Sequence, residues 1–247
     1  MVWKILLCIL FGYLIGGINP SYIIGRLRGF DIRKKGSGNA GASNAVIVMG
    51  KAIGIGSAIF DILKATAAYW LATLIPIFAD LTYAAEIAGT ACILGHMFPA
   101  YMKFKGGKGL ACLGGVLLAM DWRFFLAILA AEILLCILVD YICIVPITAS
   151  IATPIAYGLF GSQGVAPWFI KAENGWIGAA ILAIATVAML CRHVQNIRRI
   201  AHGAEMHFSY LWMKDDAKLA ERERIQRNTT LYLQKKEEKN KAKQANR

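Results

Sequence analysis

Long apolar runs dominate the chain, and short charged or polar stretches separate them. The runs cover roughly residues 5–22, 51–78, 83–102, 124–139, 142–160 and 176–190, with a shorter run over 110–120. A helix needs about 20 apolar residues to cross the core of a bilayer. The pattern therefore predicts an all-α integral membrane protein with seven transmembrane helices, of which the fourth is short.

The basic residues indicate which helix ends face the cytoplasm. Lys and Arg gather in the stretches 26–35, 103–108 and 192–199, and short loops rich in these residues usually stay on the cytoplasmic side. Seven crossings place all three stretches there, with the N-terminus outside and the C-terminus in the cytoplasm. If the run 110–120 were re-entrant, only six crossings would remain and the three stretches would no longer share a side. The first run lacks a small-x-small cleavage site, so we expect a retained helix and not a signal peptide.

Composition supports this interpretation and excludes other classes. Of 247 residues, 57% are hydrophobic and 17% are charged, and the net charge is +12. Because the basic residues lie at helix boundaries and at the C-terminus, the charge does not indicate a nucleic-acid partner. The six cysteines form no C-x-x-C pair and mostly lie within apolar runs. Free Cys packs as a small hydrophobe there, so we expect no disulfide framework, no metal and no cofactor.

The chain divides into two parts by composition. Residues 1–206 hold the apolar runs, whereas residues 207–247 are dense in both signs of charge. Such a tail is usually a solvated helix or a disordered segment. Its basic excess is expected to favour contact with anionic cytoplasmic lipid.

Two of the polar stretches are rich in glycine. The first, "GSGNAGASN" (residues 36–44), has the composition of a nest of backbone N–H groups that binds an anion, although a polar linker can have the same composition. The second, "GHMFPAYMKFKGGKG" (residues 95–109), is not a phosphate-binding Walker A loop, because Gly109 follows Lys108 where Ser or Thr is required. His96 has no H-E-x-x-H partner for a metal. An ordinary basic membrane boundary needs no glycines, so this stretch favours anion binding.

Further polar residues lie in the last run and in the second. In "RHVQNIRR" (residues 192–199), His193 and Asn196 are three apart and share a helix face. In "FDILK", Asp61 and Lys64 are also three apart. Charges inside a membrane usually face the bundle and pair, so a structural ion pair and a substrate-steering pair both remain open.

Together these stretches resemble the bacterial acyl-phosphate-dependent glycerol-3-phosphate acyltransferase family (PlsY). Its members look like G-S-G-N-x-G-A-T-N, G-H-x-F-P-x-F-x-x-F-K-G-G-K-G-V-A-T and H-x-x-N-I-x-R-L-x-x-G-x-E. This chain reads "GSGNAGASN", "GHMFPAYMKFKGGKGLAC" and "HVQNIRRIAHGAE" in the same order. The resemblance covers about residues 1–206, and three motifs in register are highly specific.

The resemblance implies a bacterial cytoplasmic-membrane enzyme that moves a fatty acyl group from acyl-phosphate to the 1-hydroxyl of glycerol 3-phosphate. Lysophosphatidic acid and phosphate would be the products, and the active site would face the cytoplasm. The catalytic residues would be Ser37, Lys108, His193 and Asn196. The substrate and its phosphates would contact Gly36, Gly38, Asn39, Gly41, Ser43, Asn44, His96, Lys105, Gly106, Gly107 and Gly109. Supporting roles would fall to Lys51, Asp61 and Lys64. Either His193 or a phosphate oxygen of the donor would take the proton of the attacking hydroxyl.

The chain departs from the family pattern in three places. Ser43 and Cys112 stand where the family has Thr, and Ile47 stands where it generally has Arg. A guanidinium there would bind phosphate in a bidentate manner, which the Lys51 ammonium can replace only as a point charge. A phosphate or organophosphate transporter is the alternative from another class. It would be expected to carry inverted repeats and broken helices, and no repeat is visible. A non-catalytic lipid-binding protein would not need three phosphate-type motifs.

Overall fold

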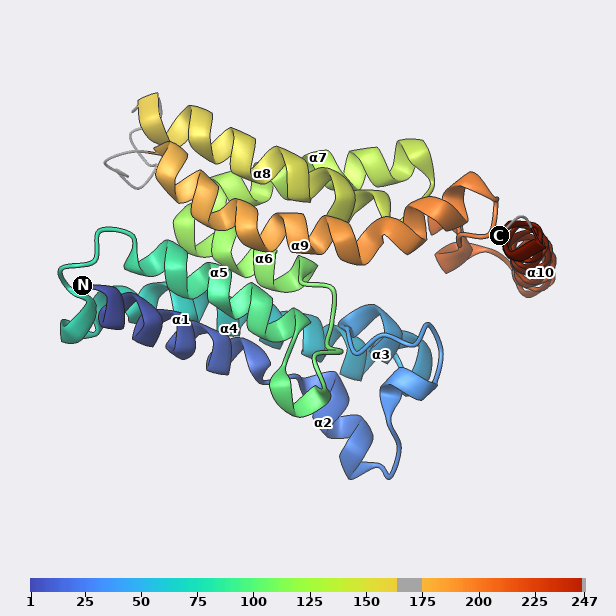
Figure 1. Ribbon diagram of the computed structural model, residues 1–247, viewed down its shortest axis with the longest axis horizontal. Coiled ribbons are helices and arrows are strands. Elements are labelled where there is room, and N and C mark those ends of the chain that lie inside the picture. The colour runs from blue at the N-terminus through green and yellow to red at the C-terminus, as the bar shows by residue number, and fades with distance from the viewer. Residues whose placement is uncertain (164–174, 246–247) are drawn as a thin grey trace.

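The computed structural model describes residues 1–163 and 175–245, and this part of the chain is helical (Figure 1). The α-helices are α1 (Val2–Gly17), α2 (Pro20–Leu27), α3 (Ala42–Met49), α4 (Lys51–Leu74), α5 (Ala84–Met97), α6 (Leu110–Met120), α7 (Trp122–Val139), α8 (Ile144–Gln163), α9 (Gly175–Ala201) and α10 (Asp215–Ala245). Short 3-10 helices are η1 (Ile32–Lys34), η2 (Pro76–Phe78), η3 (Ala100–Met102) and η4 (Phe208–Trp212). The expected all-α class is confirmed.

The long helices form a bundle with a common axis. In Figure 1, α1, α4 and α5 lie on one side, α7, α8 and α9 lie on the other, and α6 lies between them. The most extensive helix pairs are α1 with α5, α8 with α9, and α4 with α6. The N-terminus lies at one end of the bundle, whereas α2, α3 and the C-terminal end of α9 lie at the opposite end. The motif-bearing loops are therefore gathered far from the N-terminus.

Small residues let α1 and α5 approach closely. A Cβ atom on Gly12 would overlap the backbone carbonyl of Ala88, and one on Gly16 would overlap that of Cys92. Such contacts are typical of helices that associate in membranes, where close backbone packing replaces the hydrophobic driving force. This pairing anchors the C-terminal end of α5, from which the second glycine-rich loop begins.

The helices differ in how well they fit a bilayer. By length and composition, α4, α7 and α9 can each cross a membrane, and α1 with α2 is a fourth candidate if that bent pair is one span. Large apolar side chains such as Leu14, Leu134 and Ile184 are exposed on the outside of the bundle, as a lipid-facing surface requires. The count of seven crossings stays a prediction.

The sequence pattern missed some boundaries. The run 5–22 predicted one helix, but α1 and α2 meet at an angle of 46°. Pro20 has no N–H to continue a helix, and the Asn19 side chain accepts a hydrogen bond from the Tyr22 N–H (2.9 Å), so a new helix begins there. The helix α3 was not expected. The last membrane helix extends to Ala201 and carries the third motif beyond the apolar run.

Candidate active site

Residues 36–41 form a loop, here called the glycine loop, whose shape depends on Asn44. The buried Asn44 amide nitrogen lies within hydrogen-bond distance of three backbone carbonyls, which share its two N–H donors: those of Ile32 (3.1 Å), Lys35 (3.0 Å) and Asn39 (2.7 Å). Its oxygen accepts from the Ser37 N–H (2.8 Å). Gly36 has a φ of +57°, and a Cβ there would overlap the Asn44 oxygen. Because the loop uses both ends of the amide, Asn44 holds the loop, and a contact of Asn44 with substrate stays a prediction.

The glycine loop leads into the N-terminus of α3. Gly41 is the N-cap and offers no side-chain acceptor to the first N–H groups of the helix. Those groups lack partners within the helix and form its positive end, which suits an anion. Ser37 and Ser43 are exposed, and the Asn39 side-chain oxygen is buried without a hydrogen-bond partner among the described residues.

Residues 105–109 form a second loop, here called the lysine loop, which folds back on the end of α5. The Gly106 N–H donates to the Met97 carbonyl (3.0 Å) and the Gly107 N–H donates to the His96 carbonyl (3.1 Å). A Cβ on Gly107 would overlap the His96 imidazole. This contact is the physical reason for glycine in "KGGKG", which an ordinary basic boundary would not need.

Asp61, Lys64 and His96 form a buried charge cluster next to the lysine loop. The Lys64 ammonium is 2.6 Å from an Asp61 carboxylate oxygen and 3.1 Å from His96 Nδ1, and it donates to the Ile18 carbonyl (2.6 Å). His96 Nδ1 is 3.3 Å from the same Asp61 oxygen. The predicted Asp61–Lys64 pair is present. It connects α4 and α5 to the break between α1 and α2, and His96 lies between the pair and the lysine loop.

The same cluster can be tested for a metal site. Asp61, His96 and Cys112 each offer one ligand atom, and these atoms lie within 4.8 Å of one another. The Lys64 ammonium already contacts the Asp61 carboxylate. A divalent cation would have to displace it or repel it at close range. The donor set therefore fits an ion pair better than a metal centre.

The helix α9 brings the third motif to the lysine loop. Lys108 Nζ donates to Asn196 Oδ1 (2.7 Å), and Asn196 Nδ2 donates to a Glu205 carboxylate oxygen (3.0 Å). Glu205 also accepts from Arg199 Nε (2.8 Å). Burial lowers the pKa of Lys108, and the nearby Arg199 adds to this effect. An anion beside Lys108 would restore the stability of its ammonium form.

The His193 side chain is also on this buried face of α9. Its Nδ1 lies 2.8 Å from the Met189 carbonyl. A carbonyl oxygen only accepts, so Nδ1 carries the proton in this contact. The second ring nitrogen, Nε2, is then the basic one in the neutral imidazole, as a general base requires.

The three motifs meet at one end of the bundle. A Cβ on Gly41 would lie 4.0 Å from the Gly107 Cα, which places the glycine loop against the lysine loop. Arg33, in η1 just before the glycine loop, also contacts the start of the lysine loop, since its guanidinium donates to the carbonyls of Met102 in η3 (2.6 Å) and Lys105 (3.3 Å). The ion pair of Arg33 with Asp31 holds the pKa of Asp31 at about 2, so this carboxylate stays charged at neutral pH.

Sequence reasoning did not assign three residues that hold the motif segments in place. They are Arg33, Glu205 and Arg192, whose guanidinium donates to the Gly106 carbonyl (3.3 Å). Of the three, Glu205 could most easily have been assigned from the sequence, because it is the lone acidic residue in the stretch "RHVQNIRRIAHGAE". The two arginines could not be distinguished from other basic boundary residues.

Some of the residues predicted for the site are exposed on the surface. Lys105 and Lys51 are exposed, and Ile47 is exposed one turn after Ser43 on α3.

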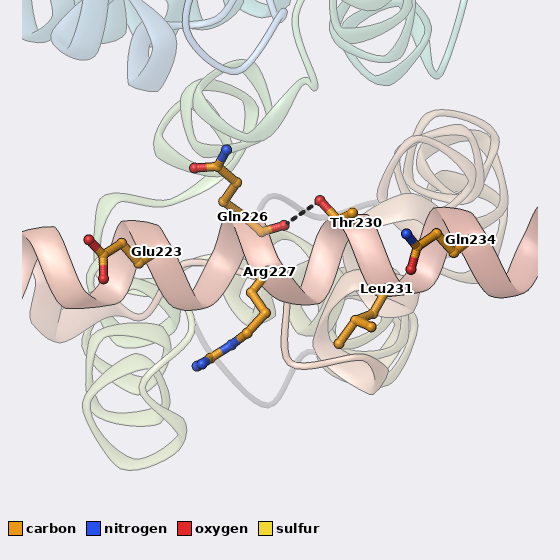
Figure 2. Close-up of a pocket in the computed structure, with 6 residues that line it drawn as sticks. All are labelled: Glu223, Gln226, Arg227, Thr230, Leu231 and Gln234. Atoms are coloured by element: carbon orange, nitrogen blue, oxygen red, sulfur yellow. Dashed lines mark hydrogen bonds between the residues drawn. The ribbon is translucent and has the colours of Figure 1, made fainter.

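A surface hollow on α10 is separate from the motifs (Figure 2). It is lined by Glu223, Gln226, Arg227, Thr230, Leu231 and Gln234. We therefore place the candidate site at the meeting point of the three motifs and not at this hollow.

Sequence comparisons support one family. The profile of the glycerol-3-phosphate acyltransferase family matches residues 6–203. A glycerol-3-phosphate acyltransferase from Brucella canis is 36% identical over 198 residues, which is 80% of this chain and 90% of that protein. Glycerol-3-phosphate acyltransferase 1 from Oceanobacillus iheyensis is 36% identical over 212 residues, covering 83% and 95% of the two chains.

Solved structures agree with the sequence relatives. PlsY (YgiH), described as an integral membrane glycerol 3-phosphate acyltransferase, matches in its glycerol 3-phosphate form with a TM-score of 0.68 and 29% identity. The alignment covers 84% of this chain and 96% of that chain. Its lysophosphatidic acid form matches with a TM-score of 0.66 and 28% identity. With the three motifs joined at one end of the bundle, these matches show that the chain belongs to the glycerol-3-phosphate acyltransferase family.

Proposed function

We propose that this protein transfers a fatty acyl group from acyl-phosphate to the 1-hydroxyl of glycerol 3-phosphate, the first step of phospholipid biosynthesis. The observation that carries the proposal is the meeting of the glycine loop, Lys108 and Asn196 at one end of an apolar bundle. Both substrates carry phosphate, and one carries a long alkyl chain. The solved relatives that match were described with glycerol 3-phosphate and with lysophosphatidic acid, which are an acceptor and a product of this reaction.

The phosphates would be bound by the two loops. Lys108 supplies a partly buried ammonium, and Lys105 supplies an exposed one. Ser37, Asn39 and Ser43, with the first N–H groups of α3, would add small donors. Glycines in the two loops would let the backbone approach the ligand. They are Gly36, Gly38, Gly41, Gly106, Gly107 and Gly109.

The reaction needs no covalent enzyme intermediate. The acceptor hydroxyl attacks the acyl carbonyl carbon, a C–O ester bond forms, and the bond from that carbon to the phosphate oxygen breaks. Phosphate leaves, and the hydroxyl proton goes either to His193 Nε2 or to a phosphate oxygen of the donor. Asn196 would orient the hydroxyl. Donors near the glycine loop would stabilise the oxyanion that develops on the carbonyl oxygen.

The membrane arrangement forms part of the proposal. We infer seven crossings in a bacterial cytoplasmic membrane, with the N-terminus outside and the site in the cytoplasm. The support is that the basic loops gather at the bundle end opposite the N-terminus. Residues 1–206 would form the catalytic unit and residues 207–247 a cytoplasmic tail. In Figure 1, α10 is seen end-on while the bundle lies lengthwise, so α10 runs across the bundle axis, as a helix lying along anionic lipid would.

A phosphate-release assay on the purified full chain tests the proposal. Palmitoyl-phosphate with glycerol 3-phosphate is expected to release phosphate and form lysophosphatidic acid in equal amounts. Omitting glycerol 3-phosphate is the control for donor hydrolysis. The chain has no H-x-x-x-x-D pair of the kind typical of thioester-dependent acyltransferases. Robust turnover with palmitoyl-CoA, in protein free of acyl-phosphate, would overturn the donor assignment.

A further inference from the structure

The tail helix α10 contacts the turn that follows α9. The family profile ends at residue 203, so α10 lies outside the part of the chain that it matches. In Figure 1, α10 lies beyond the C-terminal end of α9 and is seen end-on. The turn between them contains Gly203, which has a φ of +62°, and Glu205.

Arg224 of α10 is the main contact to this turn. One terminal nitrogen of its guanidinium donates to the Gly203 carbonyl, and the other donates to the Glu205 carbonyl (2.8 Å). The buried Glu221 orients the guanidinium by accepting from Nε (2.8 Å) and from the second terminal nitrogen (2.7 Å). Asn228 adds a second bond to the Gly203 carbonyl (2.8 Å). A planar guanidinium with several fixed donors can bridge two carbonyls in this way, whereas an ammonium is a single point.

Glu205 connects the held turn to the candidate site. Its backbone carbonyl accepts from Arg224, while its carboxylate accepts from Asn196 Nδ2 (3.0 Å). This bond fixes the direction of the Asn196 amide, so that Oδ1 faces the Lys108 ammonium (2.7 Å). If the amide rotated by half a turn, its NH₂ group would face the ammonium and this hydrogen bond would be lost.

We propose that α10 is a brace for the active site and that Arg224 is a positioning residue for the acyl transfer. By holding the Gly203–Glu205 turn, Arg224 keeps the Glu205 carboxylate where it orients Asn196 toward Lys108. The proposal rests on the proposed function, because it places Lys108 and Asn196 in the substrate site. It assigns to the tail a role beyond contact with lipid.

The first test compares two arginines of the same helix in the full chain. Arg224→Ala is expected to lower kcat/KM for glycerol 3-phosphate about tenfold, a size typical of a lost coupling between contacting groups. Arg227→Ala removes the same charge from an exposed position three residues further on. Its kcat/KM for glycerol 3-phosphate is expected to stay within about twofold of the wild-type value. Equal effects of the two substitutions would overturn the proposal.

A second test separates positioning from general stability. If Arg224 acts through Glu205, then Arg224→Ala should have little further effect in a Glu205→Ala background. A full tenfold further loss in that background would mean that Arg224 acts independently and would overturn the proposal. Arg224→Lys and Asn228→Ala are milder changes for which melting temperatures check folding. We expect intermediate losses from both, and wild-type kinetics in both would contradict the brace.

The assays also distinguish the two proposals. An inactive wild-type chain with acyl-phosphate and glycerol 3-phosphate would contradict the proposed function. An active wild-type chain whose kinetics do not respond to Arg224 would contradict only the brace.

Discussion

Lys108 is the side chain on which the proposed chemistry depends most. It is the lysine of the second motif that reaches α9, since its Nζ donates to Asn196 (2.7 Å). His193 lies on the same helix as Asn196 and presents Nε2 as its basic nitrogen. In the proposed reaction the two residues have different roles: Lys108 would neutralise phosphate, and His193 is one of the two candidate acceptors of the hydroxyl proton.

We expect Lys108→Ala to abolish measurable turnover, a loss of at least about 100-fold, because a preorganised donor to the reacting charge is removed. His193→Ala should leave a measurable remainder, since a phosphate oxygen of the donor can take the proton. Initial rates of phosphate release measure both. Lys34→Ala, which removes an exposed lysine from the glycine-loop side of the same bundle end, serves as the control. Full loss in His193→Ala with activity retained in Lys108→Ala would reverse these roles.

Ile47 gives a second prediction for a single residue. Its side chain is exposed on α3 one turn after Ser43, where the family generally has Arg. Ile47→Arg should lower the KM for glycerol 3-phosphate about tenfold, which corresponds to about 1.5 kcal/mol, the lower end for a charged hydrogen bond. A KM that is unchanged or higher would mean that Lys51 or another group already fills this role.

At the scale of elements, glycine decides how closely two segments approach. The lysine loop lies on the end of α5 because Gly106 and Gly107 leave room for the backbone and ring of His96. The helices α1 and α5 approach in the same way through Gly12 and Gly16. The buried Asp61–Lys64 pair then secures α4 against His96.

Gly107→Ala is expected to destabilise the protein by about 1–3 kcal/mol, the usual cost of overpacking, and to lower activity further. The reason is that the new Cβ would overlap the His96 ring. Melting temperature in detergent and kcat/KM measure the two effects. Gly56→Ala on α4 is the matched control, because outside its own stretch of helix no atom lies within 4 Å of a Cβ at that position. If both substitutions left the melting temperature unchanged, that result would contradict the close packing of the lysine loop on His96.

At the scale of the whole molecule, the two ends of the bundle differ in charge. The end with α2, α3 and the end of α9 carries the basic motif loops, whereas the opposite end carries the N-terminus (Figure 1). At that opposite end, Lys4 pairs with Asp80 (2.8 Å). The net charge of +12 is therefore concentrated at one end and in the tail. This asymmetry sets the predicted orientation in the membrane.

Cysteine labelling in whole cells checks that orientation. In a background without native cysteines, of which Cys191 is exposed, Thr82→Cys should react with an impermeant maleimide from outside. Lys34→Cys at the opposite end should react only after permeabilisation. Both positions are exposed. Outer labelling of Lys34→Cys in intact cells would contradict the cytoplasmic site.

The sequence by itself determined the membrane helices approximately, the three polar motifs and the family. These are local properties, because a run of apolar residues or a glycine-rich motif can be read without knowing its neighbours in space. Even the missed break between α1 and α2 had a local cause in Asn19 and Pro20.

Only the tertiary structure decided how the motif residues are used. Both ends of the Asn44 side-chain amide hold the glycine loop, whereas its expected contact with substrate stays a prediction. Lys108 and Asn196 are 88 positions apart, and Arg224 is 19 positions beyond Glu205. Contacts at such separations depend on helix packing and on the direction of each side chain. No local pattern in the sequence encodes these contacts.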